Sequence, residues 1–361
     1  MTAPRHLDAL TGLRGIAAWM VVLYHVRLSL LHLLPGDVIA VLARGYLAVD
    51  LFFMLSGFVI WYNYEQRLRD GGWDATWQFL WRRFARVWPL HATVLAGFVG
   101  FAVLLKLSGR SVSGYPFAEL PLHAVLIQNW GLTNALAWNH PAWSISTEFS
   151  AYLLFPVVVS TWRSNTSRSI AVVAAVAALA ALLYALFAVN GYDRLGKDIT
   201  GLGLVRCLVE FAMGSLMCLL WARWREQRRA ALHAALTCFF IVVAGAALKL
   251  PETALAPAVF WSALLAIALN RGIIARVLAS SVPRYLGEIS YSTYLAHFGL
   301  FIVYKMAFVG SHLQLSWTTF GGFVLMVLLV SMGLYHGLEK PAQRWLNSRG
   351  PSLRTPAPAI A

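Results

Sequence analysis

Long apolar stretches alternate with short polar connections along almost the whole chain. A helix needs about 20 mostly apolar residues to cross a bilayer. Ten stretches have this character and are predicted to be transmembrane helices: residues 10–33, 45–63, 88–107, 142–161, 169–189, 199–222, 231–249, 255–270, 286–306 and 317–337. The pattern therefore predicts an all-α, polytopic membrane protein with about ten transmembrane helices.

Two apolar stretches need a separate interpretation. The first, from Leu10 to Leu34, is too long for the core of a signal peptide, and no clear small-residue cleavage site follows it. It is predicted to stay in the protein as the first helix. The piece from Leu120 to Trp130 is too short to span a bilayer, so it is expected to lie at the membrane surface or to re-enter.

Composition supports a membrane location. Hydrophobic residues make up 59% of the chain and charged residues 12%, whereas about 25% of a soluble domain is charged. The net charge of +14 would suggest nucleic acid for a soluble protein, but cytoplasmic loops of membrane proteins collect Lys and Arg, so no nucleic-acid partner is predicted. Cys207, Cys218 and Cys238 lie in apolar stretches and are interpreted as buried small hydrophobes, without a disulfide or metal pattern.

Positive charges in the loops predict the orientation. If the N-terminus is cytoplasmic, the inside segments hold Arg5, Arg67, Arg69, Arg82, Arg83, Arg86, Arg163, Arg168, Arg223, Arg225, Arg228, Arg229, Arg271, Arg276, Arg284, Lys340, Arg344, Arg349 and Arg354. The outside segments hold only Arg44, Lys106, Arg110, Arg194, Lys197 and Lys249. This bias predicts that both termini are cytoplasmic. Residues 1–337 form one predicted transmembrane domain, and residues 338–361 form a short basic tail that is expected to be flexible.

Ionisable side chains inside membrane helices are candidates for function because they are costly unless paired or hydrated. Arg14 and His25 are eleven residues apart, so they share one helix face about 16 Å apart along its axis. Arg14 lies near the predicted cytoplasmic end and His25 beyond the midplane. The plainer alternatives are a snorkelling anchor for Arg14 and a core histidine bonded to a carbonyl for His25.

Three more ionisable residues lie in other predicted helices. Asp50 is followed by three apolar residues, so it must pair, be protonated or meet water. It could orient a histidine or pair with an arginine. Glu148 shares a helical face with Ser144 and Thr147, and His297 lies in the segment from Ser290.

Depth along the helices brings these residues to one level. At about 1.5 Å per residue, Asp50, Glu148 and His25 fall about 4–8 Å outside the midplane, and His297 falls near it. This predicts a site inside the helix bundle. In contrast, Arg206 and Glu210 are spaced i, i+4 and are expected to pair with one another in a structural role.

A basic segment precedes the third predicted helix. Arg83 and Arg86 share a face, and Pro89 is expected in the first helical turn. Cytoplasmic arginines often serve membrane orientation alone, but guanidinium groups also suit phosphate. The chain contains no Walker glycine loop, dinucleotide fingerprint, HExxH motif, spaced Cys/His cluster or Gly-x-Ser-x-Gly elbow, so no metal is predicted.

Six motifs in this order resemble the membrane acyltransferase family 3. They are Leu7 to Ala18 with His25, the run from Asp50 to Gly57, Arg83-x-x-Arg86 with Pro89, Trp143 to Pro156, Ser290 to His297, and Glu339-Lys-Pro341. Two positions depart from the family pattern. Phe149 follows Glu148 where a second glutamate is frequent, and Ala296 precedes His297 where tryptophan is usual.

The resemblance implies an integral-membrane O-acyltransferase of a bacterial cytoplasmic membrane. It would move an acyl group, most often acetyl, from acyl-coenzyme A to a hydroxyl of a saccharide or another cell-envelope or metabolite acceptor. On this hypothesis Arg14, Arg83 and Arg86 bind the coenzyme, and His25 is the general base, or alternatively forms an acyl-histidine. Asp50 or Glu148 orients His25 or stabilises its charged form, and Trp143, Ser144 and His297 contact the substrate.

A second hypothesis is a transporter or flippase for a glycan or an acylated carrier, because buried charges also mark transport paths. The chain shows no repeated halves and no paired broken helices, which disfavours it.

Overall fold

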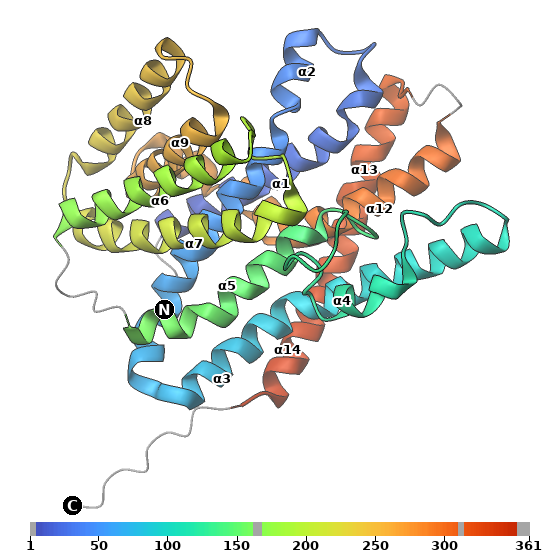
Figure 1. Cartoon of the computed structure of the whole chain (residues 1–361), viewed down its shortest axis with the longest axis horizontal. Helices are drawn as coiled ribbons and strands as arrows, with labels where there is room; N and C mark the ends of the chain where they lie inside the picture. Colours follow the sequence, from blue (N-terminus) through green and yellow to red (C-terminus); the bar gives the residue numbers. More distant parts are fainter. Residues whose placement is uncertain (1–4, 162–167, 310–313, 352–361) are drawn as a thin grey trace, which may run out of the picture.

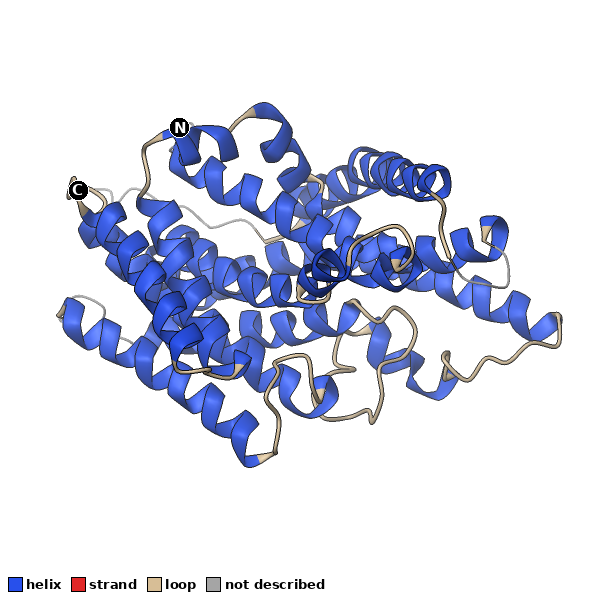
Figure 2. Ribbon diagram, turned by 90° about the horizontal axis from the view of Figure 1, so that it is seen from above, coloured by secondary structure: helices blue, strands red, loops and turns tan. Residues whose placement is uncertain are grey.

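Helices form nearly all of the ordered structure. The computed structural model describes residues 5–161, 168–309 and 314–351, and no strand forms among them (Figure 2). The long helices are α1 (Arg5–Val26), α3 (Ala48–Leu107), α5 (Ala142–Thr161), α6 (Ser169–Val189), α7 (Ile199–Trp224), α8 (Ala230–Ala247), α9 (Glu252–Leu269), α12 (Ser290–Phe308) and α13 (Trp317–Leu334). The short helices are α2 (Gly36–Leu42), α4 (Leu120–Ala124), α10 (Ile273–Leu278), α11 (Ser281–Glu288) and α14 (Lys340–Arg349). Figure 1 shows their arrangement.

The predicted fold class is confirmed, and each of the ten predicted stretches is largely helical. Within the described residues, eight stretches are long and apolar enough to cross a membrane. One of them, Gly36–Leu107, contains two predicted helices, whereas α12 does not meet the criterion although it packs between α1 and α13. The chain is therefore an all-α, multi-pass membrane protein. The cytoplasmic position of its termini stays a prediction from the loop charges.

Helix α3 is a hairpin of two helices. Gly72 has φ 55° and ψ −137°, which breaks the helix and reverses its direction. Tyr64 consequently meets Phe79, with ring centroids 5.0 Å apart, and its hydroxyl accepts a hydrogen bond from Arg83 over 3.0 Å. The second half runs through Pro89 to Leu107, so the prediction that Pro89 occupies a first helical turn was wrong.

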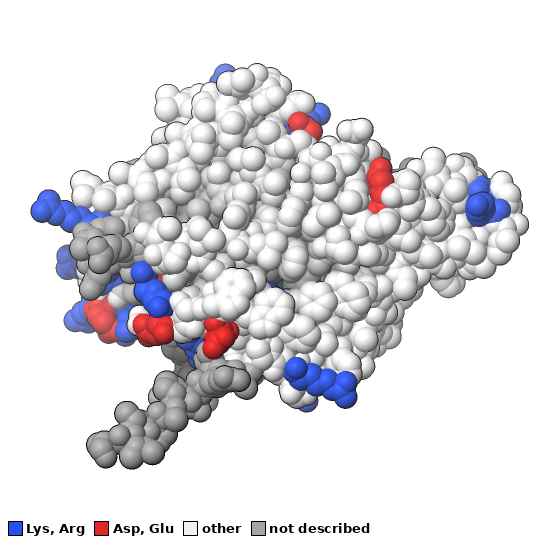
Figure 3. Space-filling model, turned by 60° about the horizontal axis from the view of Figure 1, so that its bottom comes forward, with Lys and Arg blue, Asp and Glu red and all other residues white. Residues whose placement is uncertain are grey.

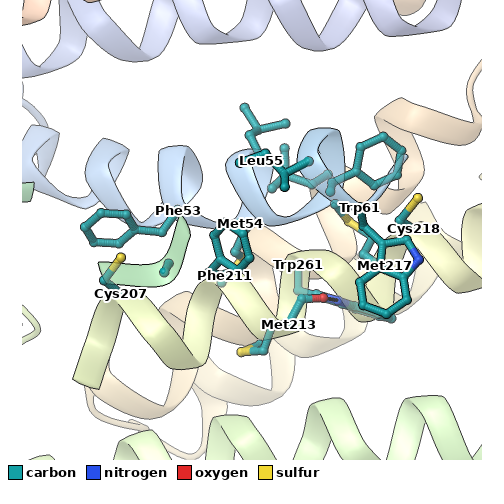
Figure 4. Close-up of a cluster of buried hydrophobic side chains, with 14 of the residues drawn as sticks. Phe53, Met54, Leu55, Trp61, Cys207, Phe211, Met213, Met217, Cys218 and Trp261 are labelled. Carbon is teal, nitrogen blue, oxygen red and sulfur yellow. Dashed lines mark hydrogen bonds between the residues drawn. The ribbon is translucent and has the colours of Figure 1, made fainter. Parts of the chain in front are cut away.

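The core lies where α3 meets α7. Gly57 and Gly214 allow the two backbones to touch, because a Cβ at either position would lie within about 2 Å of a carbonyl oxygen on the other helix. Around this contact Phe53 and Trp61 of α3 pack with residues of α7 such as Phe211 (Figure 4). Cys207 and Cys218 are buried in the same region, whereas Cys238 is only partly buried.

The segment after α13 differs from its prediction. A single π-helical turn (Tyr335–Glu339) leads into α14, which packs on α3. Trp81 donates a hydrogen bond to the carbonyl of Leu346 over 2.9 Å. The prediction of a flexible tail was therefore wrong for residues 338–351, while residues 352–361 lie outside the described part of the chain.

Charged side chains gather at the ends of the molecule. Figure 3 shows a group of basic and acidic side chains at the left end and a few separate basic or acidic side chains elsewhere, with a wide uncharged surface between them. The stretch from Leu120 to Trp130 does not form a membrane-spanning helix, because only α4 is helical and turns follow it. It contacts α3, where Trp88 donates a hydrogen bond to the carbonyl of Ala124 over 3.0 Å.

Candidate active site

A polar cavity of about 150 Å³ lies between α1, both halves of α3, α5 and α12. It is the place where four distant segments of the sequence bring their polar side chains together. Its lining consists of Arg14, Phe52, Phe53, Leu55, Ser56, Val59, Ile60, Arg83, Arg86, Val87, Ser144, Ile145, Glu148, Tyr152, Ser290, Tyr291 and Tyr294. The structure thus brings together five of the predicted site residues: Arg14, Arg83, Arg86, Ser144 and Glu148.

Arg14 and Glu148 are charged groups without an ion-pair partner. Neither forms a salt bridge within 4.0 Å of another described side chain, although Glu148 lies close enough to interact electrostatically with Arg14. Among the described residues, the guanidinium of Arg14 donates one hydrogen bond, a long one of 3.4 Å to Ser290 Oγ. Arg14 is only partly buried, and its guanidinium faces the cavity with donors left over, which suits it to binding an anion.

The other two arginines are bound differently. Arg86 pairs with Glu339, which is 2% exposed and also accepts a hydrogen bond from Ser292 Oγ over 2.6 Å. Arg83 donates to the Tyr64 hydroxyl, and its buried Nε has no hydrogen-bond partner among the described residues. Three arginines therefore face two carboxylates here, so the site keeps a positive charge.

His25 lies outside this cavity, against His297. Nε2 of His297 is 3.1 Å from Nδ1 of His25, and the latter nitrogen is also 3.0 Å from the carbonyl oxygen of Val21. Phe298 contacts His25 and is stacked on His140, with ring centroids 4.7 Å apart. His140 lies in the connection before α5, where burial lowers its pKa below the usual 6.5 and favours the neutral ring.

Tyr294 connects the two places. It lines the cavity, its hydroxyl is 2.7 Å from Ser144 Oγ, and its ring centroid is 6.1 Å from that of His297. Tyr294 and His297 are one turn apart on α12. Tyr294 therefore borders both the cavity and the histidine pair.

Asp50 and Arg206 form a separate, closed ion pair. The two carboxylate oxygens of Asp50 accept hydrogen bonds of 2.6 Å from Nε and Nη2 of Arg206, and both side chains are almost fully buried. The predicted Arg206–Glu210 pair was wrong, because Arg206 pairs with Asp50 and no ion pair joins it to Glu210 among the described residues. Arg206 instead reaches across to another helix.

Two predicted contacts of His25 do not form. Within the part of the chain that the structure describes, neither Asp50 nor Glu148 hydrogen-bonds to His25, and the four ionisable residues occupy three places instead of one site. Trp143 lies under Arg206, with the guanidinium carbon 5.5 Å from the ring centroid, and does not line the cavity. The ring of Trp143 therefore packs against the Asp50–Arg206 ion pair on its arginine side.

Sequence reasoning missed Glu339 and Tyr294 as parts of the site. Both lie in segments that matched family motifs, Glu339-Lys-Pro341 and Ser290 to His297, and that match was the available signal. No cluster of three or more His, Cys, Asp or Glu side chains among the described residues has the geometry to hold a metal ion.

Comparison with known proteins identifies the family of this chain. A family model for acyltransferase family 3, described as an acyltransferase domain, matches residues 7–336. Acyltransferase MdmB of Streptomyces mycarofaciens is 30% identical over 98% of this chain and 96% of its own. Protein 2 of the picA locus of Rhizobium radiobacter is 30% identical over 47% of this chain and 89% of its own. A predicted O-acetyltransferase of Staphylococcus aureus (strain COL) is 27% identical over 44% of this chain and 25% of its own. No solved structure shows a significant match.

Proposed function

Since the chain belongs to acyltransferase family 3 and is a membrane acyltransferase, we propose that it moves an acetyl group from acetyl-coenzyme A to an acceptor hydroxyl. The acceptor is a saccharide or another cell-envelope or metabolite compound. The membrane is the bacterial cytoplasmic membrane, and the arginine cavity opens toward the cytoplasm, which supplies the coenzyme. The name of the staphylococcal relative supports acetyl as the acyl group.

The unpaired Arg14 in the cavity carries this proposal. Phosphate groups are the anions that guanidinium binds best, and coenzyme A brings several of them. Arg83, with its free buried Nε, supplies a second cationic contact. The cavity is smaller than the roughly 300–1,000 Å³ that is typical of pockets that hold a whole ligand. We therefore place the phosphates at its arginine-lined mouth and only the acyl-pantetheine end inside.

His25 then acts on the acceptor hydroxyl as a general base, the usual role of a histidine in such a site. The thioester end reaches Tyr294, whose ring borders the histidine pair. The acceptor meets the thioester there from the opposite side of the membrane or from its plane. Asp50 takes no part in this step, because both its carboxylate oxygens are held by Arg206.

Binding of acetyl-coenzyme A to the purified protein in lipid nanodiscs tests the proposal. We expect Arg14→Gln to raise the Kd about 10–100-fold, since a hydrogen bond to a charged group contributes about 1.5–3 kcal/mol. The matched control is Arg276→Gln, which removes an exposed arginine of α10 that lies outside the cavity lining. Equal affinity of wild type and Arg14→Gln, or no binding by the folded wild type, would contradict the proposed coenzyme site.

A further inference from the structure

His25 and His297 face each other from α1 and α12, but they differ in exposure. His297 is 0% exposed, whereas His25 is partly exposed. A substrate can therefore reach His25 only, and His297 stands behind it. This arrangement separates a histidine that meets the acceptor from one that supports it.

Backbone carbonyls fix the proton of His297. Its Nδ1 lies 2.7 Å from the carbonyl oxygen of Tyr294 and 3.2 Å from that of Thr293. A carbonyl oxygen only accepts, so Nδ1 carries the hydrogen and donates it. In the neutral ring Nε2 then has the lone pair, and it points at His25 as an acceptor.

The same logic fixes the proton of His25. Its Nδ1 lies 3.0 Å from the carbonyl oxygen of Val21, so this nitrogen also carries a hydrogen. That N–H is shared between the Val21 carbonyl and Nε2 of His297 in a three-centre hydrogen bond. The lone pair of His25 is consequently on Nε2, and no described residue forms a hydrogen bond with that nitrogen.

We propose that His297 is a positioning residue that holds His25 in the orientation in which Nε2 is the base. This inference rests on the proposed acyl transfer. The acceptor O–H bond breaks as its proton moves to Nε2 of His25, and the oxygen bonds to the thioester carbon. The C–S bond then breaks, and the proton passes from Nε2 to the sulfur of the leaving coenzyme A. Throughout, Nε2 of His297 stabilises the positive charge on His25 by accepting its Nδ1–H.

The other charged groups near His25 cannot replace this acceptor. His140 and Arg27 act on His25 electrostatically, and in their positive forms both disfavour a second positive charge. Arg27 is held by the carbonyl of Tyr24 and lies over the Tyr24 ring. Among the described residues, His297 provides the one side chain that accepts a hydrogen bond from His25.

Two substitutions of His297 separate its role as a hydrogen-bond acceptor from its role in packing. His297→Leu keeps a similar volume without an acceptor, and His297→Gln keeps an oxygen that can accept. The assay measures acetyl transfer from labelled acetyl-coenzyme A into the acceptors of membranes that contain the protein. For His297→Leu we expect kcat to fall about 10–100-fold with unchanged KM for acetyl-coenzyme A. The acidic limb of its pH–rate profile should shift by about one unit toward lower pH, since the protonated ring of His25 loses the hydrogen-bond acceptor that stabilises it.

The Gln variant should keep the wild-type position of that limb and most of the rate. If Leu and Gln variants lose activity equally with an unmoved limb, His297 has only a structural role and the inference is overturned. A wild-type rate and limb for His297→Leu would overturn it as well.

A spectroscopic measurement keeps this inference separate from the proposed activity. In nanodiscs, protein with ¹⁵N-labelled histidines should show a ¹⁵N–¹⁵N correlation between His25 Nδ1 and His297 Nε2, and both His25→Ala and His297→Leu should abolish it. If wild-type membranes transfer no acetyl group, the proposed function fails while this correlation still supports the pairing. Absence of the correlation in folded wild type would overturn the pairing whatever the activity.

Discussion

Two groups of charged residues within the helices of this bundle look alike in the sequence and differ in the structure. Asp50 and Arg206 satisfy each other with two hydrogen bonds of 2.6 Å and are almost completely buried. Arg14 and Glu148 both line a cavity, and neither has an ion-pair partner among the described residues. The first group joins α3 to α7. The second presents charge to a cavity.

The difference teaches that an ionisable residue within a membrane helix does not by itself mark a functional site. A closed pair has no capacity left for a ligand, and its removal should harm folding. An open charge that faces a cavity keeps its capacity, and its removal should harm binding. The following substitutions test this distinction, beginning with the largest expected effect.

Removal of Arg206 should be the most damaging change. Arg206→Met leaves Asp50 without its partner and Glu210 close beside it, and an unpaired buried charge costs about 3–5 kcal/mol. We expect most of the protein to be lost from the folded fraction in detergent size-exclusion chromatography. The double variant Arg206→Met with Asp50→Asn should recover part of it, because one orphaned charge is removed. Normal folding of the single variant would show that the pair is dispensable.

Glu339→Gln should have an intermediate effect, both on stability and on coenzyme binding. The variant loses the ion pair with Arg86 and keeps an acceptor for Ser292, so we expect the free energy of unfolding to fall by about 1–2 kcal/mol. It also frees Arg86, so acetyl-coenzyme A should bind more tightly. Thermal unfolding and titration in the same nanodiscs measure both. Weaker coenzyme binding at normal stability would contradict this role of Glu339.

Glu148→Gln should change binding but not folding. It removes one negative charge from the cavity lining, so a bound anion meets less electrostatic repulsion. We expect acetyl-coenzyme A to bind about 5-fold more tightly, opposite in sign to Arg14→Gln, with an unchanged unfolding temperature. A large loss of stability would place Glu148 in the structural group instead.

The smallest effect concerns acid stability outside the membrane helices. Burial, with a smaller contribution from His91, lowers the pKa of His123 to about 4 from its usual 6.5. Because the folded protein holds this ring neutral, its stabilising contribution is complete above pH 6.5 and is lost as the pH falls toward 4. His123→Gln should therefore lose less stability than wild type between pH 7 and pH 5. Identical slopes of unfolding temperature against pH would refute this.

Helices were predictable from the sequence because their signals are local. The ranges 142–161 and 169–189 agree with α5 and α6 at both ends, since a mostly apolar run of sufficient length between polar connections defines each span. The same local reasoning failed for partners. Arg206 was assigned to Glu210 four residues away, but it bonds to Asp50, which is 156 residues distant. Which face of α7 meets α3 depends on close packing at Gly57 and Gly214, and the periodicity of one helix does not specify it.

The sequence allowed several residues of the site to be identified, but not which of them lie together. Arg14, Arg83, Arg86, Ser144 and Glu148 do share one cavity. Glu339 was not assigned to it because its contact with Arg86 spans 253 residues and requires α14 to dock on α3. The depth argument placed Asp50 and His25 at one level, but equal depth does not place two side chains on facing helix surfaces.

The central claim is that this chain transfers an acyl group from the coenzyme with His25 as the base. The most direct measurement follows label from radiolabelled acetyl-coenzyme A in membranes that contain wild type or His25→Ala, at equal amounts of folded, inserted protein. The account predicts label in a glycan, lipid or small-metabolite fraction with wild type and none above background with the variant. Equal transfer by both proteins would contradict it.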